Sequence, residues 1–201
     1  RTRHPIYGYT SVSASLLDAI TDWNKKRYNL TFDREALTLI PGVMSGVSAA
    51  LYALSAPGDG VVVQPPLYPP LMHTVRKTHR LLLKNQLILK DGRYRINFDE
   101  LEHLFKIHQP KILLFCSPHN PVGRVWSREE VARIVELTER YQVCLVSDDL
   151  HADIIFAPHR HISALSLAGQ GGNRIIVLNS ASKSFNVAGL NTAYAVIPDK
   201  M

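Results

Sequence analysis

A lysine flanked by serines has the most informative chemistry in this sequence. Lys183 lies in Ser180-Ala181-Ser182-Lys183-Ser184-Phe185-Asn186, directly after the apolar run Arg174–Asn179. Because burying an unpaired ammonium is costly, a lysine beside a buried strand favours a role in which its amine forms a Schiff base. The hydroxyls of Ser180 and Ser182 could donate to phosphate oxygens. The alternative is a loop lysine whose ammonium lies in water, and this segment alone does not decide between the two.

Asp148 ends a second apolar run, Val143–Asp148, where a lone carboxylate would be poorly solvated. A protonated pyridine nitrogen would satisfy it, and an aspartate there strengthens such a ring as an electron sink. The alternatives are a helix cap or a loop ion pair, for which Asp149 and Asp153 also qualify. Asp148, Asp149 and His151 also resemble a metal site, but Asp-Asp-x-His lacks a further spaced ligand pair, so no metal is predicted.

Three further segments offer groups that a flat, phosphorylated ligand needs. Asn120 lies between Pro118 and Pro121, which we expect to hold its loop extended, and its amide could donate to a phenolic oxygen. Tyr68 could stack on a heterocycle, although a plain turn aromatic is the alternative. Small residues in Pro41-Gly42-Val43-Met44-Ser45-Gly46 would let backbone N–H groups approach a phosphate at a helix N-terminus.

Apolar runs alternate with amphipathic stretches along the chain. Strands are predicted at Leu37–Ile40, Gly60–Gln64, Arg80–Leu83, Lys111–Cys116, Val143–Asp148, Arg174–Asn179 and Ala193–Ile197. Helices are predicted at Ser13–Arg27, Val43–Leu54, Tyr68–Thr78, Asn97–His108 and Ser127–Tyr141. This alternation predicts an α/β fold, a three-layer, mostly parallel sheet with helices on both faces. Such sheets bind ligands beyond the carboxyl ends of their strands, so the polar residues after three strands are expected to converge on one pocket.

Composition narrows the classes of function. The 201 residues are 46% hydrophobic, enough for one large domain. The net charge is +6, but Lys and Arg are scattered, so no nucleic-acid partner is predicted. No apolar run approaches the roughly 18 residues that a membrane span needs. Cys116 and Cys144 lie in apolar runs and are predicted to be buried thiols, for which the reducing cytoplasm is the simpler setting.

Three motifs are specific in combination: Ser-Pro-His-Asn-Pro-Val-Gly at 117–123, Ser-Asp-Asp-Leu-His-Ala-Asp at 147–153 and Ser-Ala-Ser-Lys-Ser-Phe-Asn at 180–186. In this order they resemble the fold-type I pyridoxal-phosphate enzymes related to aspartate aminotransferase, of class I/II. Within them, the chain is most similar to the C–S β-lyase branch, the cystathionine β-lyases of MalY/PatB type. The resemblance covers nearly the whole chain.

The resemblance implies a role for each candidate residue and pyridoxal 5'-phosphate as the cofactor. Lys183 would carry the cofactor and move protons, Asp148 would pair with the pyridine nitrogen, Asn120 with the phenolic oxygen, and Tyr68 would stack on the ring. The phosphate would be held by Val43, Met44, Ser180 and Ser182. Tyr9 would reach the phosphate of a neighbouring subunit, which implies a homodimer with shared active sites.

Two positions in the resemblance favour a lyase over an aminotransferase. His151 lies where typical aminotransferases carry a tyrosine that bonds the phenolic oxygen, and Asn191 lies where many carry an arginine for the phosphate. Asp149 departs from the lyase pattern, in which glutamate is commoner, at a side chain that does not contact the cofactor. The implied reaction cleaves cystathionine or a related S-substituted cysteine to a thiol, pyruvate and ammonia. The alternatives are an aminotransferase and a non-catalytic regulatory or cofactor-binding module.

The resemblance assigns residues 1–201 to the cofactor-binding large domain. Family members have a second, smaller domain, so we expect an N-terminal arm and a C-terminal small domain to lie outside this chain. The arginine that binds the substrate carboxylate would belong to that small domain, and the chain alone is therefore expected to be inactive. Arg124, on the Asn120 loop, is the nearest rival for this role.

Overall fold

The chain forms a seven-stranded sheet. The structure is a computed structural model that describes residue 9, residues 11–168 and residues 174–198. The strands are β1 (Leu37–Ile40), β2 (Gly60–Val63), β3 (Leu81–Lys84), β6 (Ile112–Cys116), β7 (Cys144–Asp148), β8 (Ile175–Asn179) and β9 (Ala193–Val196). Their order across the sheet is β1-β9-β8-β7-β6-β2-β3. β9 is antiparallel to both of its neighbours, whereas the other neighbouring strands are parallel. Every predicted strand is present, within one residue of its predicted ends.

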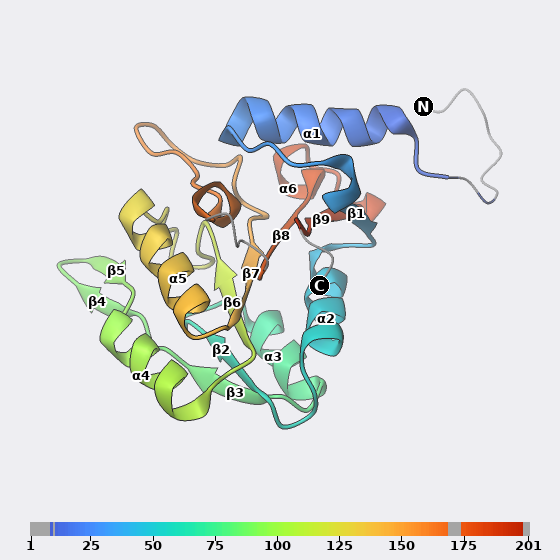
Figure 1. Cartoon of the computed structure of the whole chain (residues 1–201). Coiled ribbons are helices and arrows are strands. Elements are labelled where there is room, and N and C mark those ends of the chain that lie inside the picture. The colour runs from blue at the N-terminus through green and yellow to red at the C-terminus, as the bar shows by residue number, and fades with distance from the viewer. Residues whose placement is uncertain (1–8, 10, 169–173, 199–201) are drawn as a thin grey trace.

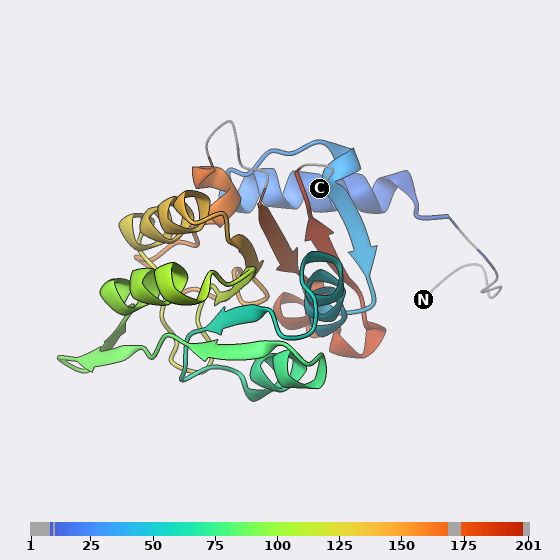
Figure 2. The same cartoon turned by 60° about the horizontal axis from the view of Figure 1, so that its bottom comes forward.

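Helices cover both faces of the sheet, as predicted (Figures 1 and 2). One face is covered by α2 (Val43–Leu54) and α3 (Pro69–Lys77), and the other by α1 (Ala14–Tyr28), α4 (Phe98–His108) and α5 (Arg128–Arg140). Alternate strand residues serve the two apolar cores: in β6, Ile112 and Leu114 pack with α2 and α3, whereas Leu113 and Phe115 pack with α4 and α5. This alternation explains why the central strands are apolar on both faces.

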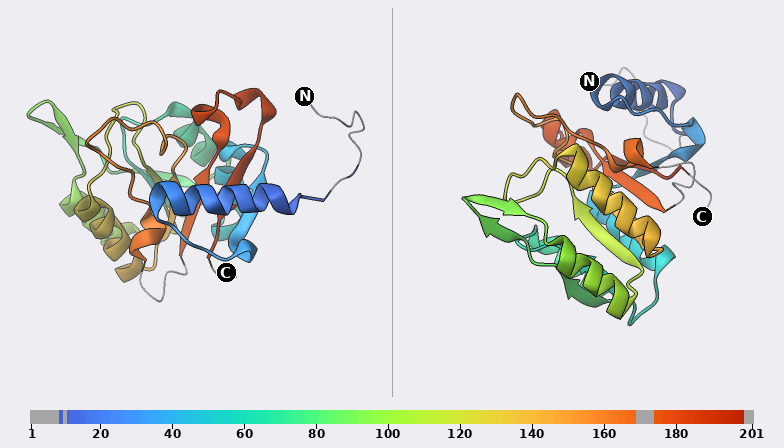
Figure 3. Two further views of the ribbon diagram at one scale, coloured as in Figure 1. Left: turned by 90° about the horizontal axis from the view of Figure 1, so that it is seen from above. Right: turned by 60° about the vertical axis from the view of Figure 1, so that its left-hand side comes forward.

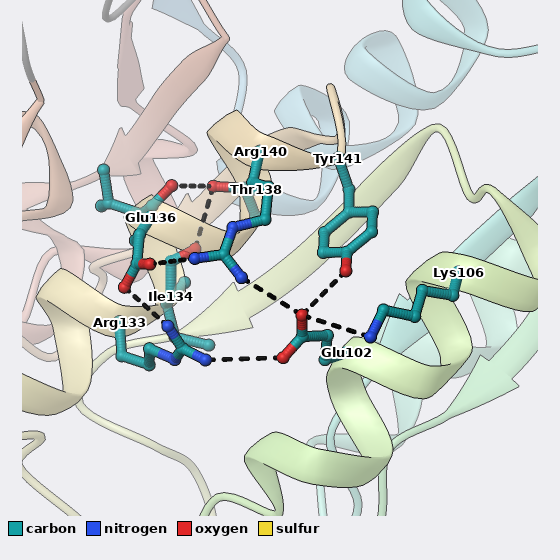
Figure 4. Close-up of polar contacts among 9 residues, drawn as sticks. Glu102, Lys106, Arg133, Ile134, Glu136, Thr138, Arg140 and Tyr141 are labelled. Carbon is teal, nitrogen blue, oxygen red and sulfur yellow. Dashed lines mark hydrogen bonds and ion pairs between the residues drawn. The ribbon is translucent and has the colours of Figure 1, made fainter.

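The outer helices α4 and α5 lie side by side (Figure 3, right). Ser127 and Glu130 form the predicted capping box at the start of α5. Figure 4 shows a charge network between the helices, in which Glu102 of α4 accepts from Arg133 and Arg140 of α5. Because these pairs are solvent-exposed, they orient the helices more than they stabilise them.

A small antiparallel hairpin was not predicted. It joins β4 (Ile88–Lys90) to β5 (Arg93–Arg95) through Asp91 and Gly92, whose φ angles are 53° and 69°. Two consecutive residues with positive φ are typical of a tight hairpin turn, for which Asp-Gly is a strong sequence signal. Four short helices were also not predicted: η1 (Arg34–Ala36), η2 (Ala164–Leu167), α6 (Ala181–Ser184) and η3 (Ala188–Leu190). Across the described ranges, no helix combines the length and apolar character that crossing a membrane requires.

The helix α2 packs very closely on the sheet at Gly46. A Cβ atom at this position would lie 2.5 Å from Ile40 Cδ1 and 3.0 Å from Leu178 Cδ2. The first turn of α2 lies at the carboxyl-end edge of the sheet, so this contact sets how far the N-terminus of α2 lies from the strand ends.

We predict that Gly46→Ala lowers the free energy of unfolding by up to about 2 kcal/mol. Overpacking a core costs about 1–3 kcal/mol, of which the better helix propensity of alanine recovers about 1 kcal/mol. Ile40→Val removes the Cδ1 atom, so the same substitution should cost less in that background. Urea unfolding of the four proteins measures this coupling, and an equal cost in both backgrounds would contradict the close contact.

Candidate active site

The predicted polar residues meet in one pocket at the carboxyl ends of β6, β7 and β8. These strands are adjacent, with Cys116 opposite Asp148 and Asp148 opposite Leu178. The pocket has a volume of about 350 Å³. The predicted residues that line it are Val43, Met44, Tyr68, Asn120, Asp148, His151, Ser180, Ser182 and Lys183. Tyr9 is the exception, because its exposed side chain does not line this pocket.

Asp148 provides a desolvated carboxyl group to the pocket. Burial raises its pKa to about 7, the N–H of Leu150 opposes this shift by donating to Oδ1 at 3.2 Å, and the neighbouring Asp149 adds to it. The structure therefore agrees with the expectation that this carboxylate is poorly solvated. A cation placed beside it would restore its charged form, which makes the pocket suited to a protonated ring nitrogen.

Lys183 lies in the same pocket, but it is not buried. It belongs to the single-turn helix α6, and its side chain is exposed. Of the two alternatives left open from sequence, the structure shows the exposed lysine, because β8 ends at Asn179 and Lys183 lies on the short helix that follows. Its charge does affect the site: burial first, and then the Lys183 ammonium, lower the pKa of His151 below its ordinary value.

The two serines before Lys183 have different roles in this structure. The Ser180 hydroxyl donates to the Thr192 carbonyl at 2.6 Å and accepts the Ser182 backbone N–H at 3.0 Å. Its single proton is thus already used, and Ser180 acts as the cap of α6. Of the two predicted phosphate donors, only Ser182 has a hydroxyl without a hydrogen-bond partner among the described residues.

Asn120 and Tyr68 are held together through their backbones. The Tyr68 N–H donates to the Asn120 carbonyl at 3.0 Å, and the Asn120 N–H donates to Cys116 Sγ at 3.4 Å. The loop is not extended as predicted. It is a tight turn closed by the His119 N–H, which donates to the Arg124 carbonyl at 2.8 Å.

Arg124 is not free to bind a substrate carboxylate. Its guanidinium group donates to both carboxylate oxygens of Glu130, at 2.5 and 2.7 Å, and to the Tyr94 carbonyl at 2.7 Å. It also lies 4.6 Å from the centre of the Trp126 ring. This arginine anchors the Asn120 turn to α5 and β5, and no arginine is among the described residues that line the pocket.

The N-terminus of α2 faces the pocket with unused backbone donors. Gly42, the residue before the helix, has a φ of 112°, a conformation that other residues adopt only with strain. The first N–H groups of a helix have no partner within it, so those of Val43 and Met44 can bind an anion. Glycine thus suits these two positions for different reasons. Gly42 has a backbone conformation that favours glycine, and Gly46 packs too closely for a side chain.

The acidic neighbours of Asp148 have partners away from the pocket. Asp149 accepts from Ser147 Oγ at 2.5 Å and pairs with His161 Nε2 at 2.7 Å. Asp153 forms an ion pair with Arg27 at 3.4 Å. No group of three or more His, Cys, Asp or Glu side chains within the described ranges is placed to hold a metal ion.

Other residues that line the pocket were missed from sequence, among them Cys116, Leu150, Ala188 and Thr192. Cys116 could have been found, because it ends β6 directly beside the end of β7. Burial raises the pKa of its thiol, which donates to the Pro118 carbonyl at 3.3 Å. Thr192 follows Asn191, whose left-handed φ of 49° redirects the chain, and no local pattern indicates this.

The family model for aminotransferase class I and II matches residues 2–201. The chain belongs to the class I and II aminotransferase family. It is 40% identical over 203 residues to cystathionine β-lyase PatB of Bacillus subtilis, covering 100% of this chain and 52% of that protein. It is 29% identical over 198 residues to protein MalY of Escherichia coli, covering 98% of this chain and 50% of MalY. The predicted resemblance to this branch of the family is therefore confirmed.

Solved structures of the family agree with the fold. Cystalysin from Treponema denticola, whose structure contains pyridoxal 5'-phosphate, superposes with a TM-score of 0.93 at 33% identity. The match covers 96% of this chain and 49% of cystalysin. The chain thus spans about half the length of the curated relatives it matches.

We predict that the charge of Asp148 makes the ligand-free protein less stable as pH rises. The pKa of an aspartate in an unfolded chain is about 4, whereas burial raises the pKa of Asp148 in the folded protein to about 7. Between these values the unfolded state binds fewer protons, so stability is lost as pH rises through this window. Relative to Asp148→Asn, which has no charge to bury, the wild type should lose stability from about pH 4 to about pH 7 and then level off. Urea unfolding across this range measures the difference, and parallel pH profiles would contradict it.

Proposed function

We propose that the protein is a pyridoxal-phosphate-dependent C–S β-lyase. It would cleave cystathionine or a related S-substituted cysteine to a thiol, pyruvate and ammonia. The observation that carries the proposal is that Lys183 and the desolvated Asp148 line one pocket, at the carboxyl ends of adjacent strands. The similarity to a cystathionine β-lyase over the whole of this chain supports it.

The residues of the pocket fit pyridoxal phosphate. Asp148 has a raised pKa that a pyridinium nitrogen would lower, which makes the pairing favourable. The backbone donors at the start of α2 and the free hydroxyl of Ser182 suit a phosphate. Lys183 supplies the amine for a Schiff base. When bound, this cofactor supplies an electron sink for the charge left by removal of the α-proton.

Each of these side chains would then have a separate task. Lys183 Nζ would take the α-proton from the substrate and hold it near the departing thiol. Asp148 would keep the ring nitrogen protonated, and the Asn120 amide would donate to the phenolic oxygen. Tyr68 would cover one face of the ring. His151, neutral because its pKa is lowered, would lie beside the same phenolic oxygen.

The proposal extends to a longer, dimeric enzyme. These residues would be its cofactor-binding large domain, which is supported by the half-length match to the relatives. A smaller domain would supply the arginine for the substrate carboxylate, because Arg124 is already paired with Glu130. Tyr9, exposed and outside its own pocket, would reach the phosphate site of the other subunit. We propose a cytoplasmic location, in keeping with the two buried free thiols.

An aminotransferase is the second candidate, because the matching family model describes that activity. The same Lys183 and Asp148 would serve it. The replacements at His151 and Asn191 favour the lyase, and both side chains line the pocket. The two activities differ in their products, since an aminotransferase needs a 2-oxo acid as amino-group acceptor.

We predict that the full-length protein releases thiol and pyruvate from cystathionine without added 2-oxo acid. Lys183→Ala should lower this rate by about 10²–10⁴-fold, because proton transfer loses its catalyst. The 201-residue chain should be far slower per site, because no arginine among its described residues lines the pocket to clamp a carboxylate. Turnover that requires a 2-oxo acid would favour the aminotransferase. Equal rates for the short chain would show that its own residues hold the carboxylate.

A further inference from the structure

The Asp153 carboxylate accepts hydrogen bonds from two separate elements, the helix α1 and the short helix α6 that carries Lys183. From α1, Trp23 Nε1 lies 3.1 Å and Tyr28 Oη 2.5 Å from Oδ1, and Arg27 Nε lies 3.4 Å from the same oxygen. From α6, Ser184 Oγ lies 2.7 Å from Oδ2. The Asp153 side chain is only 11% exposed, so these bonds are shielded from water.

The helix α6 depends on such contacts for its position. It has a single turn, which cannot hold its shape alone, and none of its residues is buried. Besides the Ser180 cap, two contacts link its far end to α1. Ser184 bonds to Asp153, and the Phe185 ring lies edge-on to Trp23, with 5.3 Å between the ring centres. Figure 1 shows α6 directly beneath α1.

Apolar packing between α1 and α6 is loose. A cavity of about 220 Å³ lies between them, lined on the α1 side by Leu16, Ile20 and Trp23 and on the other side by Ala181 and Phe185. Asp153 borders the same cavity. Because close packing does not hold the two helices together here, the hydrogen bonds to Asp153 are the stronger constraint.

Asp153 also belongs to the segment that carries Asp148. The turn after β7 is tied at Asp149, whose side chain pairs with His161 and whose carbonyl accepts the Ala152 N–H at 2.9 Å. Asp153 follows at the end of this turn. One short segment therefore holds the pocket carboxylate at its start and the anchor of the lysine helix at its end.

We propose that Asp153 is a positioning residue that, through Ser184, fixes the Lys183 turn relative to Asp148. This rests on the proposed function, because the distance between these two groups matters for a ligand that both must contact. The carboxylate itself does not line the pocket that Lys183 lines. Its effect on the site passes through Ser184, the residue next to the lysine.

Two substitutions provide a matched test, because each removes one hydroxyl group that donates a hydrogen bond to Asp153. Ser184→Ala removes the bond to α6 and leaves the α1 donors, whereas Tyr28→Phe removes an α1 donor and leaves Ser184. Ser184→Thr, which keeps a hydroxyl, is the rescue variant. For each purified protein, amide hydrogen exchange of residues 181–187 is measured without ligand. Schiff-base formation with added pyridoxal phosphate is then followed by absorbance, borohydride reduction and peptide mapping.

We expect Ser184→Ala to speed hydrogen exchange in residues 181–187 and to weaken Schiff-base formation at Lys183, each by about tenfold, the effect of losing one hydrogen bond to a charged group. Ser184→Thr should restore both. Tyr28→Phe should speed exchange in α1 and lower the melting temperature, while Schiff-base formation stays within about twofold of wild type.

The outcomes separate this proposal from the proposed function. Wild-type exchange at residues 181–187 in Ser184→Ala would overturn the positioning role, whether or not the cofactor binds. Equal losses of Schiff base in Ser184→Ala and Tyr28→Phe would also overturn it, because Asp153 would then act only through overall stability. A wild-type protein that forms no adduct at Lys183 would instead refute the proposed function.

Discussion

The site depends on one electrostatic constraint, a half-buried carboxyl group at the end of β7 whose pKa is raised by desolvation. Because burial raises its pKa to about 7, the ionised form of Asp148 is held at a cost, which a nearby cation would relieve. β7 lies between β6 and β8, so the loops that follow these strands reach the same carboxyl group from both sides. Asn120 comes from the β6 side and Lys183 from the β8 side. The parallel arrangement of the three strands makes this convergence unavoidable.

Each loop around Asp148 is held by a hydrogen bond from a side chain that lies outside the pocket. Arg124 anchors the Asn120 turn by pairing with Glu130 and lying over Trp126. His161 holds the Asp149 side chain, and Ser184 links α6 to Asp153. Each of these hydrogen bonds is made to a carboxylate, and such bonds constrain direction as well as distance. These contacts hold the loops around the pocket without using the side chains of Asn120, Ser182 or Lys183.

Much of this arrangement could be predicted from local sequence patterns. The apolar runs located every strand of the main sheet, and the polar residues after three strands predicted one pocket. The position of Asp148 at a strand end also predicted its poor solvation. Local geometry was harder to predict: the exposure of Lys183 was left open, and the prediction of an extended Asn120 loop was wrong, because the loop folds back on itself. The Asp-Gly hairpin was a sequence signal that was overlooked.

Other features lay beyond local patterns. Asp149, Asp153 and Arg124 each had several candidate partners in the sequence. The Trp23 contact with Asp153 spans 130 positions and the Ser184 contact spans 31, so only the folded chain identifies them. The same holds for the Ser180 hydroxyl, which donates its proton to the Thr192 carbonyl. The chain reaches this position through Asn191, whose φ is left-handed. Sequence thus predicted which groups meet at the pocket, whereas the structure determined which of them are free to bind.

The most direct test of this account is the protonation state of the cofactor ring nitrogen. Pyridoxal phosphate labelled with nitrogen-15 at that position can be bound to the protein and observed by NMR. We predict a protonated nitrogen in the wild type at neutral pH and loss of that proton in Asp148→Asn, because the carboxylate and the pyridinium stabilise each other. An unprotonated nitrogen in the wild type, or the same protonation state in both proteins, would contradict the central role of Asp148.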